Sequence, residues 1–467
     1  MSALWTAEEA QAATGGEVQG SWAARAVSID SRSLEPGDLF VALEGENRDG
    51  HQFVSAAFAN GAAAAIVSRV PGGMGPETPL LVVPDTQAGL EALGRVGRAR
   101  AAARIAGVTG SVGKTGTKEA LRHVLSAQGV THASAASHNN HWGVPLSLAR
   151  LPRDADFGVF ELGMNHPGEI ARLTAYVRPH VALITLIAPA HLGFFSSLEG
   201  IAAAKAEIFD GLEPGGTAVL NRDDDYFDSL RVRAEPRTAA FLTYGVHPAA
   251  DWRLVDARLD EAGSDVVAAR HGRELAYRIG TPGRHWVQNS LGVLATVEGL
   301  GADPEAAGRA MASLQAPAGR GLKRRIPLAG GDATLIDESY NANPASMRAA
   351  LDLLGQMPGR RIAVLGDMLE LGDRGPELHA ALAEPVQQAG VAVLFSCGPL
   401  TAALQAAVPP TLRAVHAADS AALVEEVLHE VQPGDFVLVK GSLGSRMGLI
   451  VEALTRGHAD APAAGAA

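Results

Sequence analysis

Residues 107–121, GVTGSVGKTGTKEAL, combine glycines, a lysine and a threonine at a spacing that suits nucleotide phosphates. Glycines let successive backbone N–H groups converge on phosphate oxygens, and the N-terminus of a following helix adds partial positive charge. The lysine would reach the β- and γ-phosphates, and the threonine hydroxyl would bind Mg²⁺. The sequence therefore predicts an ATP- or GTP-binding loop made of Thr109, Gly110, Ser111, Val112, Gly113, Lys114, Thr115 and Gly116.

One position departs from the strict phosphate-loop template, because Val108 stands where G-x-x-x-x-G-K-[ST] has its first glycine. The alternative interpretation is an unrelated turn before a helix. The apolar run 104–108 before the loop and the helical pattern TGTKEALRHVL after it favour the phosphate site.

Three ionisable residues follow strand-like runs downstream of this loop. Glu161 ends the run FGVFEL, at the edge where open parallel sheets bind ligands, and His191 follows the run LITLI. Lys205 lies in the helical pattern EGIAAAKAEIFDGL. Each has a plainer interpretation: a loop carboxylate, a structural histidine, and a solvated or snorkelling lysine. Their placement after consecutive strands favours a catalytic role for all three.

Composition limits the classes of function. The chain has 467 residues, 47% hydrophobic and 19% charged, which is typical of soluble globular proteins of about three domains. A net charge of −12 argues against nucleic-acid and anionic-membrane partners, because both attract basic patches. The single cysteine, Cys397, excludes an internal disulfide. Neither a signal peptide nor a membrane span is recognisable, so we expect a cytoplasmic protein, and a monomer by default.

Alternating strand and helix patterns predict an α/β protein of three domains. The expected domains are an N-terminal α/β domain (1–100), a central phosphate-loop ATPase domain with a mainly parallel sheet (101–317) and a C-terminal Rossmann-like α/β domain (318–457). The segment APAGRGLK (316–323) reads as a linker, and the small-residue tail 458–467 as disordered.

Several blocks of sequence resemble the Mur ligase family, the ATP-dependent amide-forming enzymes of bacterial cell-wall synthesis. Residues 28–54, SIDSRSLEPGDLFVALEGENRDGHQFV, are similar to the family's UDP-substrate domain, and HNNHWGVPLSL (138–148) to the segment after its ATP loop. The blocks IDESYNANPASM (336–347), GDMLELG (366–372) and LVKGS (438–442) resemble the branch that adds D-alanyl-D-alanine. The DNPR-type motif of the diaminopimelate-adding branch is absent.

The resemblance implies an ATP-dependent ligase that joins D-Ala-D-Ala to UDP-MurNAc-tripeptide through an acyl phosphate. Phosphoryl transfer from ATP and attack of the amine on the acyl phosphate both concentrate negative charge, so cations should supply much of the rate acceleration. By similarity, Lys114 is catalytic, Thr115 and Glu161 hold Mg²⁺, and His191 helps to hold a second ion. The family's lysine at the position of Lys205 is carbamylated, which implies a carbamate that supports that second Mg²⁺.

Further nucleotide contacts are implied for three residues. Asn289 matches the adenine-reading position, Arg320 would approach the γ-phosphate, and Asp337 would bind the ribose. The respective alternatives are a helix N-cap, a solvated linker charge and a strand-end turn residue. If Arg320 and Asp337 do contact ATP, the C-terminal domain must close onto the central one.

Substrate contacts are expected in all three domains. The alternative for the segment DSR (30–32) is an ordinary turn with no ligand. The alternative for SYNANP (339–344) is an Asn-rich turn before a helix that starts near Pro344. The candidates that bind the UDP-sugar, the stem or the dipeptide are Ser31, Arg32, Asn139, Asn140, Tyr340, Asn341, Asn343, Lys440 and Ser442.

Other interpretations remain open from the residues alone. A folylpolyglutamate synthase or another amino-acid-adding ligase would share the loop, but the YNANP and GDMLELG blocks argue against both. A phosphate-loop switch would need no second α/β domain. A catalytically inactive homologue is disfavoured by the presence of Lys114, Glu161, His191 and Lys205.

Overall fold

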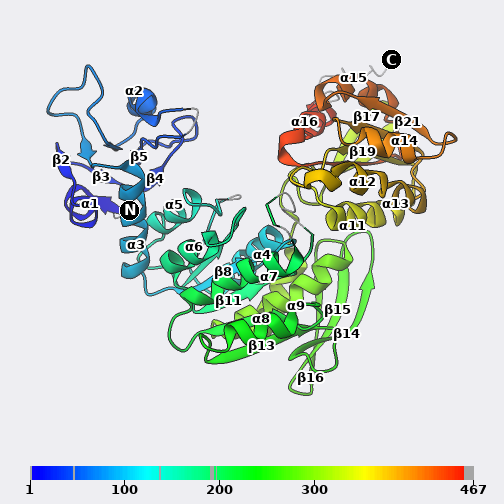
Figure 1. The fold of residues 1–467 in the computed structure, drawn as a ribbon, viewed down its shortest axis with the longest axis horizontal. Helices are drawn as coiled ribbons and strands as arrows, with labels where there is room; N and C mark the ends of the chain where they lie inside the picture. Colours follow the sequence, from blue (N-terminus) through cyan, green and yellow to red (C-terminus); the bar gives the residue numbers. More distant parts are fainter. Residues whose placement is uncertain (1–2, 46–47, 136–137, 190–193, 196, 457–467) are drawn as a thin grey trace, which may run out of the picture.

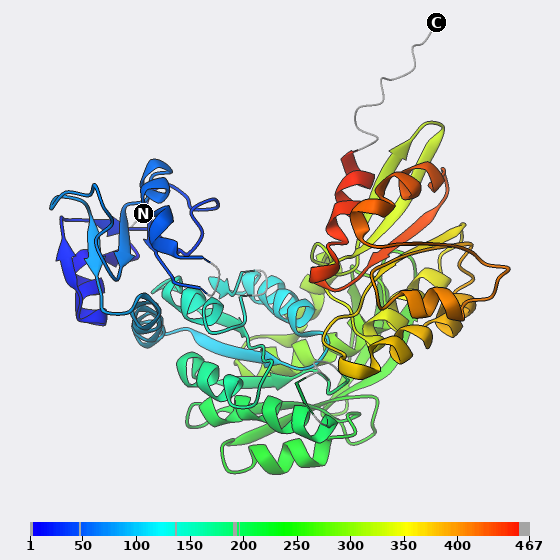
Figure 2. The same ribbon diagram turned by 45° about the horizontal axis from the view of Figure 1, so that its top comes forward.

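A computed structural model describes residues 3–45, 48–135, 138–189, 194–195 and 197–456. Within them, three sheets of five, nine and six strands follow one another along the chain, which confirms the three-part α/β fold. The N-terminal and C-terminal parts stand on either side of the central part in both views (Figures 1 and 2). Among the described residues, no helix has the length and apolar character needed to cross a membrane.

The N-terminal part is built on the sheet β2-β7-β6-β5-β4, in which only the β2–β7 pair is antiparallel. A small antiparallel pair, β1 with β3, lies beside helix α1. The elements are β1 (Trp5–Thr6), α1 (Ala7–Thr14), β2 (Glu17–Gln19), β3 (Ala23–Ala24), β4 (Ala26–Ser28), β5 (Asp38–Val41), α2 (Val54–Ala59), β6 (Ala64–Val67), β7 (Leu80–Val82) and α3 (Thr86–Arg100).

The central sheet runs in the order β16-β15-β14-β13-β12-β11-β8-β10-β9. Strands β8 to β14 are parallel, and β14, β15 and β16 form an antiparallel meander that the sequence patterns did not predict. The strands are β8 (Arg104–Thr109), β9 (Thr131–Ala133), β10 (Phe157–Glu161), β11 (Val181–Ile184), β12 (Thr217–Asn221), β13 (Ala240–Gly245), β14 (Trp252–Leu259), β15 (Ser264–Arg270) and β16 (Arg273–Ile279).

Helices cover both faces of the central sheet because its strands alternate buried side chains between two cores. Ala106 and Val108 join one core with α4 and α9, whereas Ile105 joins the other with α5 to α8. The helices are α4 (Lys114–Ser126), α5 (Gly143–Ala149), α6 (Glu169–Val177), α7 (Leu198–Ala206), α8 (Phe227–Ala234), α9 (Arg284–Gly299) and α10 (Pro304–Ala310).

The C-terminal part has the sheet order β17-β18-β22-β19-β20-β21, and all pairs except β17–β18 are parallel. Strand β17 begins within the expected linker, so the connection is shorter than predicted. The elements are β17 (Leu322–Leu328), β18 (Gly331–Glu338), α11 (Pro344–Gly355), β19 (Arg361–Gly366), α12 (Gly375–Ala380), α13 (Ala383–Gln388), β20 (Val393–Cys397), α14 (Ala402–Ala407), β21 (Arg413–Ala417), α15 (Ser420–Glu430), β22 (Phe436–Lys440) and α16 (Gly448–Arg456).

Strand order places the predicted site at a topological switch point. After β8 the chain moves to β9 and β10 on one side, then returns to β11 on the other. Ligands of open α/β sheets bind where the strand order reverses in this way, at the carboxyl ends of the strands. The phosphate loop follows β8, and Glu161 ends β10.

Candidate functional site

The predicted phosphate loop forms a tight strand-to-helix turn between β8 and α4. Gly110 has φ +147°, and a Cβ there would lie 1.9 Å from Thr185 Oγ1. Gly113 has φ +88° and directly precedes the first residue of α4. Both positions therefore require glycine, because an L side chain would clash or be strained.

Neighbouring strands hold this loop in place. The Thr185 hydroxyl, after β11, donates to Val112 O at 2.6 Å, and Ser111 N donates to Leu186 O at 2.7 Å. The Thr109 hydroxyl donates to Leu162 O. The Ser111 N–H is thus engaged within the protein, whereas the buried Ser111 hydroxyl finds no hydrogen-bond partner among the described residues.

Lys114 folds back over the loop, where its Nζ donates to Gly110 O at 2.7 Å. Burial lowers the pKa of this amine; Glu161 opposes the shift, and the Arg320 guanidinium adds to it. The lysine therefore lies among the charges expected of a phosphate site, with a cation from the C-terminal part nearby.

Thr115 and Glu161 meet beside the loop, as their assignment to one metal requires. The Thr115 hydroxyl donates to Glu161 Oε2 at 2.8 Å, and both side chains are buried. Adjacent oxygen ligands of octahedral Mg²⁺, with bonds of about 2.1 Å, lie about 3 Å apart. This donor pair fits Mg²⁺, and Glu161 is a strand-end residue, not the loop carboxylate of the plainer interpretation.

Lys205 lies inside the protein, on helix α7, with 1% of its surface exposed. Burial, followed by repulsion from Lys114, holds the pKa of its amine well below the ordinary value. The solvated or snorkelling interpretation is therefore wrong. Among the described residues, no hydrogen bond or ion pair to Lys205 is found. His191, the fourth predicted catalytic residue, lies outside the described residues.

Asn289 faces the phosphate loop from helix α9. A Cβ on Gly113 would lie 3.0 Å from Asn289 Nδ2, so the amide packs directly against the loop. Asn289 lies inside α9, whose N-cap is Gly283, and the N-cap interpretation is therefore wrong. The Trp286 ring, on the same helix, packs against Gly116 in the first turn of α4.

Arg320 and Asp337 lie where the C-terminal part begins. The Arg320 guanidinium stacks on the Tyr340 ring, 4.5 Å from its centroid, and its charge reaches Lys114. Arg320 is therefore no solvated linker charge. The Asp337 carboxylate accepts from Gly319 N at 3.0 Å and from the Ser339 hydroxyl at 2.6 Å. It thus ties down the turn that carries Arg320, as expected of a strand-end turn residue.

The dipeptide candidates cluster at the carboxyl ends of β18 and β22. Lys440 is buried and donates to Glu338 Oε2 and Asn341 O, both at 3.0 Å. Asn343 is the N-cap of α11, with Ser346 in a reciprocal capping box, so the helix begins at Pro344 as the turn interpretation predicted. Ser442 Oγ accepts from Leu369 N at 2.9 Å. Lys440 and Asn343 therefore shape the site through structural contacts, and their roles in substrate binding stay predictions.

The UDP-substrate candidates in the N-terminal part are engaged locally. Arg32 pairs with Asp30, and this contact lowers the pKa of that carboxyl to about 2. The Ser31 carbonyl accepts from Asn60 Nδ2 at 2.8 Å. These contacts are those of an ordinary turn, which the sequence left open as the alternative to substrate binding. Substrate binding by Ser31 and Arg32 stays a prediction.

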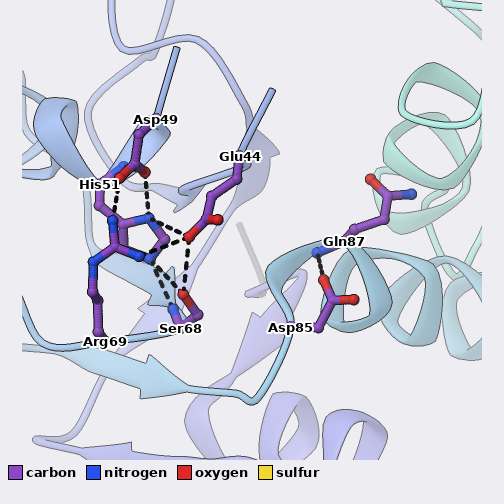
Figure 3. A network of polar contacts seen from close by, with 7 residues as sticks. All are labelled: Glu44, Asp49, His51, Ser68, Arg69, Asp85 and Gln87. Atoms are coloured by element: carbon purple, nitrogen blue, oxygen red, sulfur yellow. Dashed lines mark hydrogen bonds and ion pairs between the residues drawn. The ribbon is translucent and has the colours of Figure 1, made fainter. Parts of the chain in front are cut away.

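Figure 3 shows a second polar cluster in the N-terminal part, around His51. Glu44, Asp49 and His51 offer three ligand atoms close enough together for a metal ion. Arg69 pairs with both carboxylates, and His51 Nε2 accepts from Ser68 N at 2.9 Å. Because its ligand atoms are already engaged, we read this cluster as a support for the loop before His51.

The segment between β9 and α5 carries Asn139 and Asn140, both predicted to bind substrate, and it lies beside a lysine that the sequence did not reveal. Asn139 Nδ2 donates to Glu161 Oε1 at 2.8 Å, and Asn140 Oδ1 accepts from Gly143 N at the start of α5. Lys118, fully buried one turn after Lys114, donates to Ser134 O at 2.7 Å. The available sequence signal was a lysine on the apolar face of the predicted helix after the loop; no role was predicted for Lys118.

Comparison with known proteins agrees with this geometry. Three family models match successive parts of the chain: "Mur ligase family, catalytic domain" at residues 24–82, "Mur ligase middle domain" at 108–297 and "Mur ligase, glutamate ligase domain" at 324–443. The UDP-N-acetylmuramoyl-tripeptide–D-alanyl-D-alanine ligase of Escherichia coli is 38% identical over 443 residues, covering 94% of this chain and 96% of its own.

Relatives and solved structures of the same name extend the match. The Bacillus subtilis ligase is 31% identical and covers 92% of each chain. A MurF crystal structure from Acinetobacter baumannii aligns with a TM-score of 0.82 at 32% identity, over 97% of this chain and 98% of its own. MurF from Thermotoga maritima, solved in complex with ADP, aligns with a TM-score of 0.74 at 26% identity, over 92% of this chain and 97% of its own. The chain belongs to the Mur ligase family.

Proposed function

We propose that this protein ligates D-alanyl-D-alanine to UDP-N-acetylmuramoyl-tripeptide, with conversion of ATP to ADP and phosphate. The observation that carries the proposal is the convergence of Lys114, Thr115 and Glu161 at the switch point of the central sheet. The near full-length similarity to ligases of this name supports the choice of substrates. The chain is thus an ATP-dependent, peptide-bond-forming enzyme.

The reaction follows from the weakness of a carboxylate as an acyl donor. Transfer of the γ-phosphoryl group from ATP to the carboxylate of the tripeptide gives an acyl phosphate and ADP. The dipeptide amine then attacks the acyl carbon, loses a proton, and expels phosphate to leave the new amide. Mg²⁺ held by Thr115 and Glu161 would neutralise phosphate charge in the first step.

The chain's own residues provide binding and orientation. Lys114 places a cation at the loop that receives the β- and γ-phosphates. Arg320 extends from the C-terminal part toward the same charges, and we propose that it meets the γ-phosphate when the two parts close. Asn289 beside Gly113 supports the assignment of the adenine pocket to this side of the loop.

Four further assignments belong to the same proposal. A second Mg²⁺ near His191, a carbamate on Lys205, a cytoplasmic location and a monomeric state stay predictions. The burial of Lys205 supports the carbamate, because CO₂ reacts with the neutral amine that the lowered pKa favours.

Phosphate release measured with Mg-ATP, UDP-MurNAc-tripeptide and D-Ala-D-Ala, each omitted in turn, tests the function. We expect release only with all three substrates, together with a pentapeptide product by mass spectrometry. Phosphate release that does not depend on D-Ala-D-Ala would indicate that the enzyme uses another acceptor. Nucleotide binding without turnover of any acceptor would favour a switch or an inactive homologue.

A further inference from the structure

Two described residues between β9 and α5, Ser134 and Asn139, contact the carboxyl end of β10 and the residues after it. Ser134 N donates to Val159 O at 3.1 Å, and Glu161 N donates to Ser134 Oγ at 3.2 Å. Farther along, Gly163 N donates to Asn139 O at 2.8 Å. These contacts hold the segment against the strand end that carries Glu161.

Asn139 makes the contact that matters for the site. Its Nδ2 donates to Glu161 Oε1 at 2.8 Å, while the other carboxylate oxygen, Oε2, faces the Thr115 hydroxyl. A metal ion bound by Thr115 and Oε2 would leave the Asn139 contact in place, because that contact uses the opposite oxygen. The amide thus fixes the rotation of the carboxylate, and its contact is compatible with an ion on the opposite oxygen.

Packing leaves Asn139 little freedom to turn away. A Cβ on Gly163 would lie 2.8 Å from the Asn139 side chain, so the amide fits closely against that glycine. Lys118 supports the start of the same segment through Ser134 O. This buried lysine also pairs with Glu119 Oε1 at 2.6 Å, which offsets the cost of burying its charge.

We infer that Asn139 is a positioning residue for the metal carboxylate of Glu161, with Ser134 and Lys118 supporting the segment that carries it. This replaces its assignment to substrate binding and rests on the proposed function. Partners that orient metal-ligating side chains contribute about 10- to 100-fold to metal affinity. Replacement of Asn139 should therefore lower metal affinity, which can be measured separately from turnover.

The test is Mn²⁺ binding by electron paramagnetic resonance in the presence of a non-hydrolysable ATP analogue, using the full chain. We expect Asn139→Leu to weaken Mn²⁺ binding about tenfold and to leave analogue affinity in EDTA and the melting temperature of the metal-free protein unchanged. Ser134→Ala, which removes the hydroxyl that accepts from Glu161 N, should weaken Mn²⁺ binding by a smaller factor.

Gln128→Leu is the matched control, because Gln128, two residues beyond the end of α4, exchanges amide hydrogen bonds with the Asp303 backbone. It should bind Mn²⁺ as the wild type does. Wild-type Mn²⁺ affinity in Asn139→Leu, above all with a raised KM for the tripeptide, would overturn the inference and restore a substrate role. If the wild-type protein binds no Mn²⁺ with the analogue, the proposed function itself fails.

Discussion

Charged groups buried near one another define the chemistry of this site. Lys114 and Lys205 repel each other, and burial lowers the pKa of both amines. Glu161 supplies a negative charge near Lys114, whereas no described residue pairs with Lys205. Such an amine favours a modification that removes its positive charge, and the carbamate proposed above would do so.

Replacement of Lys205 by alanine tests this idea. We expect Lys205→Ala to lose most ligase activity, and to recover part of it when a small carboxylic acid is added at high concentration. The acid would supply the negative group that the carbamate provides. The measurement is phosphate release with and without the acid, with an equal concentration of chloride as the salt control.

Full activity of Lys205→Ala would rule out both the carbamate and a catalytic role for this residue. Activity lost without recovery, in a variant that keeps the wild-type melting temperature, would assign the neutral amine itself to the site.

Two histidines connect elements of the central sheet in their neutral form. His180 Nδ1 accepts from Ile105 N at the start of β8, and His132 on β9 contacts Ser147 O of α5 through Nε2. Burial is the main cause that lowers the pKa of each ring to about 4. Both rings are thus neutral in the folded protein at neutral pH.

This neutral state predicts how stability depends on pH. Each histidine takes up a proton on unfolding at any pH between about 4 and the ordinary value of about 6.5. The free energy of unfolding should therefore be highest above pH 6.5 and should fall as the pH falls toward 4. Urea unfolding at pH 7.5, 6.5 and 5.5 measures this slope.

Variants that keep the hydrogen bonds isolate the histidine contribution. In His180→Asn and His132→Gln, the amide oxygen and nitrogen replace Nδ1 and Nε2. The double variant should show a shallower slope between pH 7.5 and 5.5. An unchanged slope would assign the pH dependence to other groups.

Helix α3 is packed against α5 through glycines. A Cβ on Gly97 would lie 2.3 Å from Leu148 O, whereas a Cβ on Gly89, in the same helix, would make ordinary contact with Val83 at 3.4 Å. Because backbone atoms cannot yield as a side-chain tip can, Gly97→Ala should force the two helices apart.

We expect Gly97→Ala to lower the free energy of unfolding by about 1–3 kcal/mol, as in other overpacked interiors. Gly89→Ala serves as the matched control and should be neutral or slightly stabilising, because alanine favours helix. Urea unfolding followed by circular dichroism measures both. Equal effects of the two variants would contradict the packing explanation.

The two junctions between the three parts of the molecule differ in how tightly they are packed. Leu146 and Ala149 of α5 belong to the same hydrophobic core as Trp5 and Leu90 of the N-terminal part, and Trp5 Nε1 donates to Ala149 O at 2.8 Å. Within the described residues, no hydrophobic core includes residues of both the central and the C-terminal parts. Lys323 Nζ, which donates to Glu261 O, is one of the polar contacts across that junction.

The C-terminal part should therefore move alone when substrates bind. Cys397 is buried, and the pKa of its thiol is raised to about 12, so it will not compete with introduced labelling sites. We expect the distance between spin labels at Val232→Cys (α8) and Ala421→Cys (α15) to shorten with an ATP analogue and UDP-MurNAc-tripeptide. Labels at Ala12→Cys (α1) and Val232→Cys should keep their distance. A change in the second pair would contradict a rigid N-terminal and central unit.

Local patterns were sufficient for the elements that position the nucleotide. The glycines, Lys114 and Thr115 predicted the turn between β8 and α4, because a phosphate loop depends on neighbours in sequence. The strand-like run before Glu161 placed that carboxylate at the correct sheet edge. The antiparallel meander β14–β16 and the early start of β17 were missed, because many positions of these strands carry polar or charged residues, which give a weak strand signal.

The sequence by itself determined the family and the α/β fold and predicted the phosphate-loop residues, because the motifs and patterns that indicate each are contiguous. Only the tertiary structure decided which side chains meet: Asn139 with Glu161, Lys118 with Ser134, and Arg320 with the surroundings of Lys114. It also decided which lysines are buried and which domains share a core. These properties depend on residues far apart in the chain, whose contacts arise only when the strands take their order in the sheet.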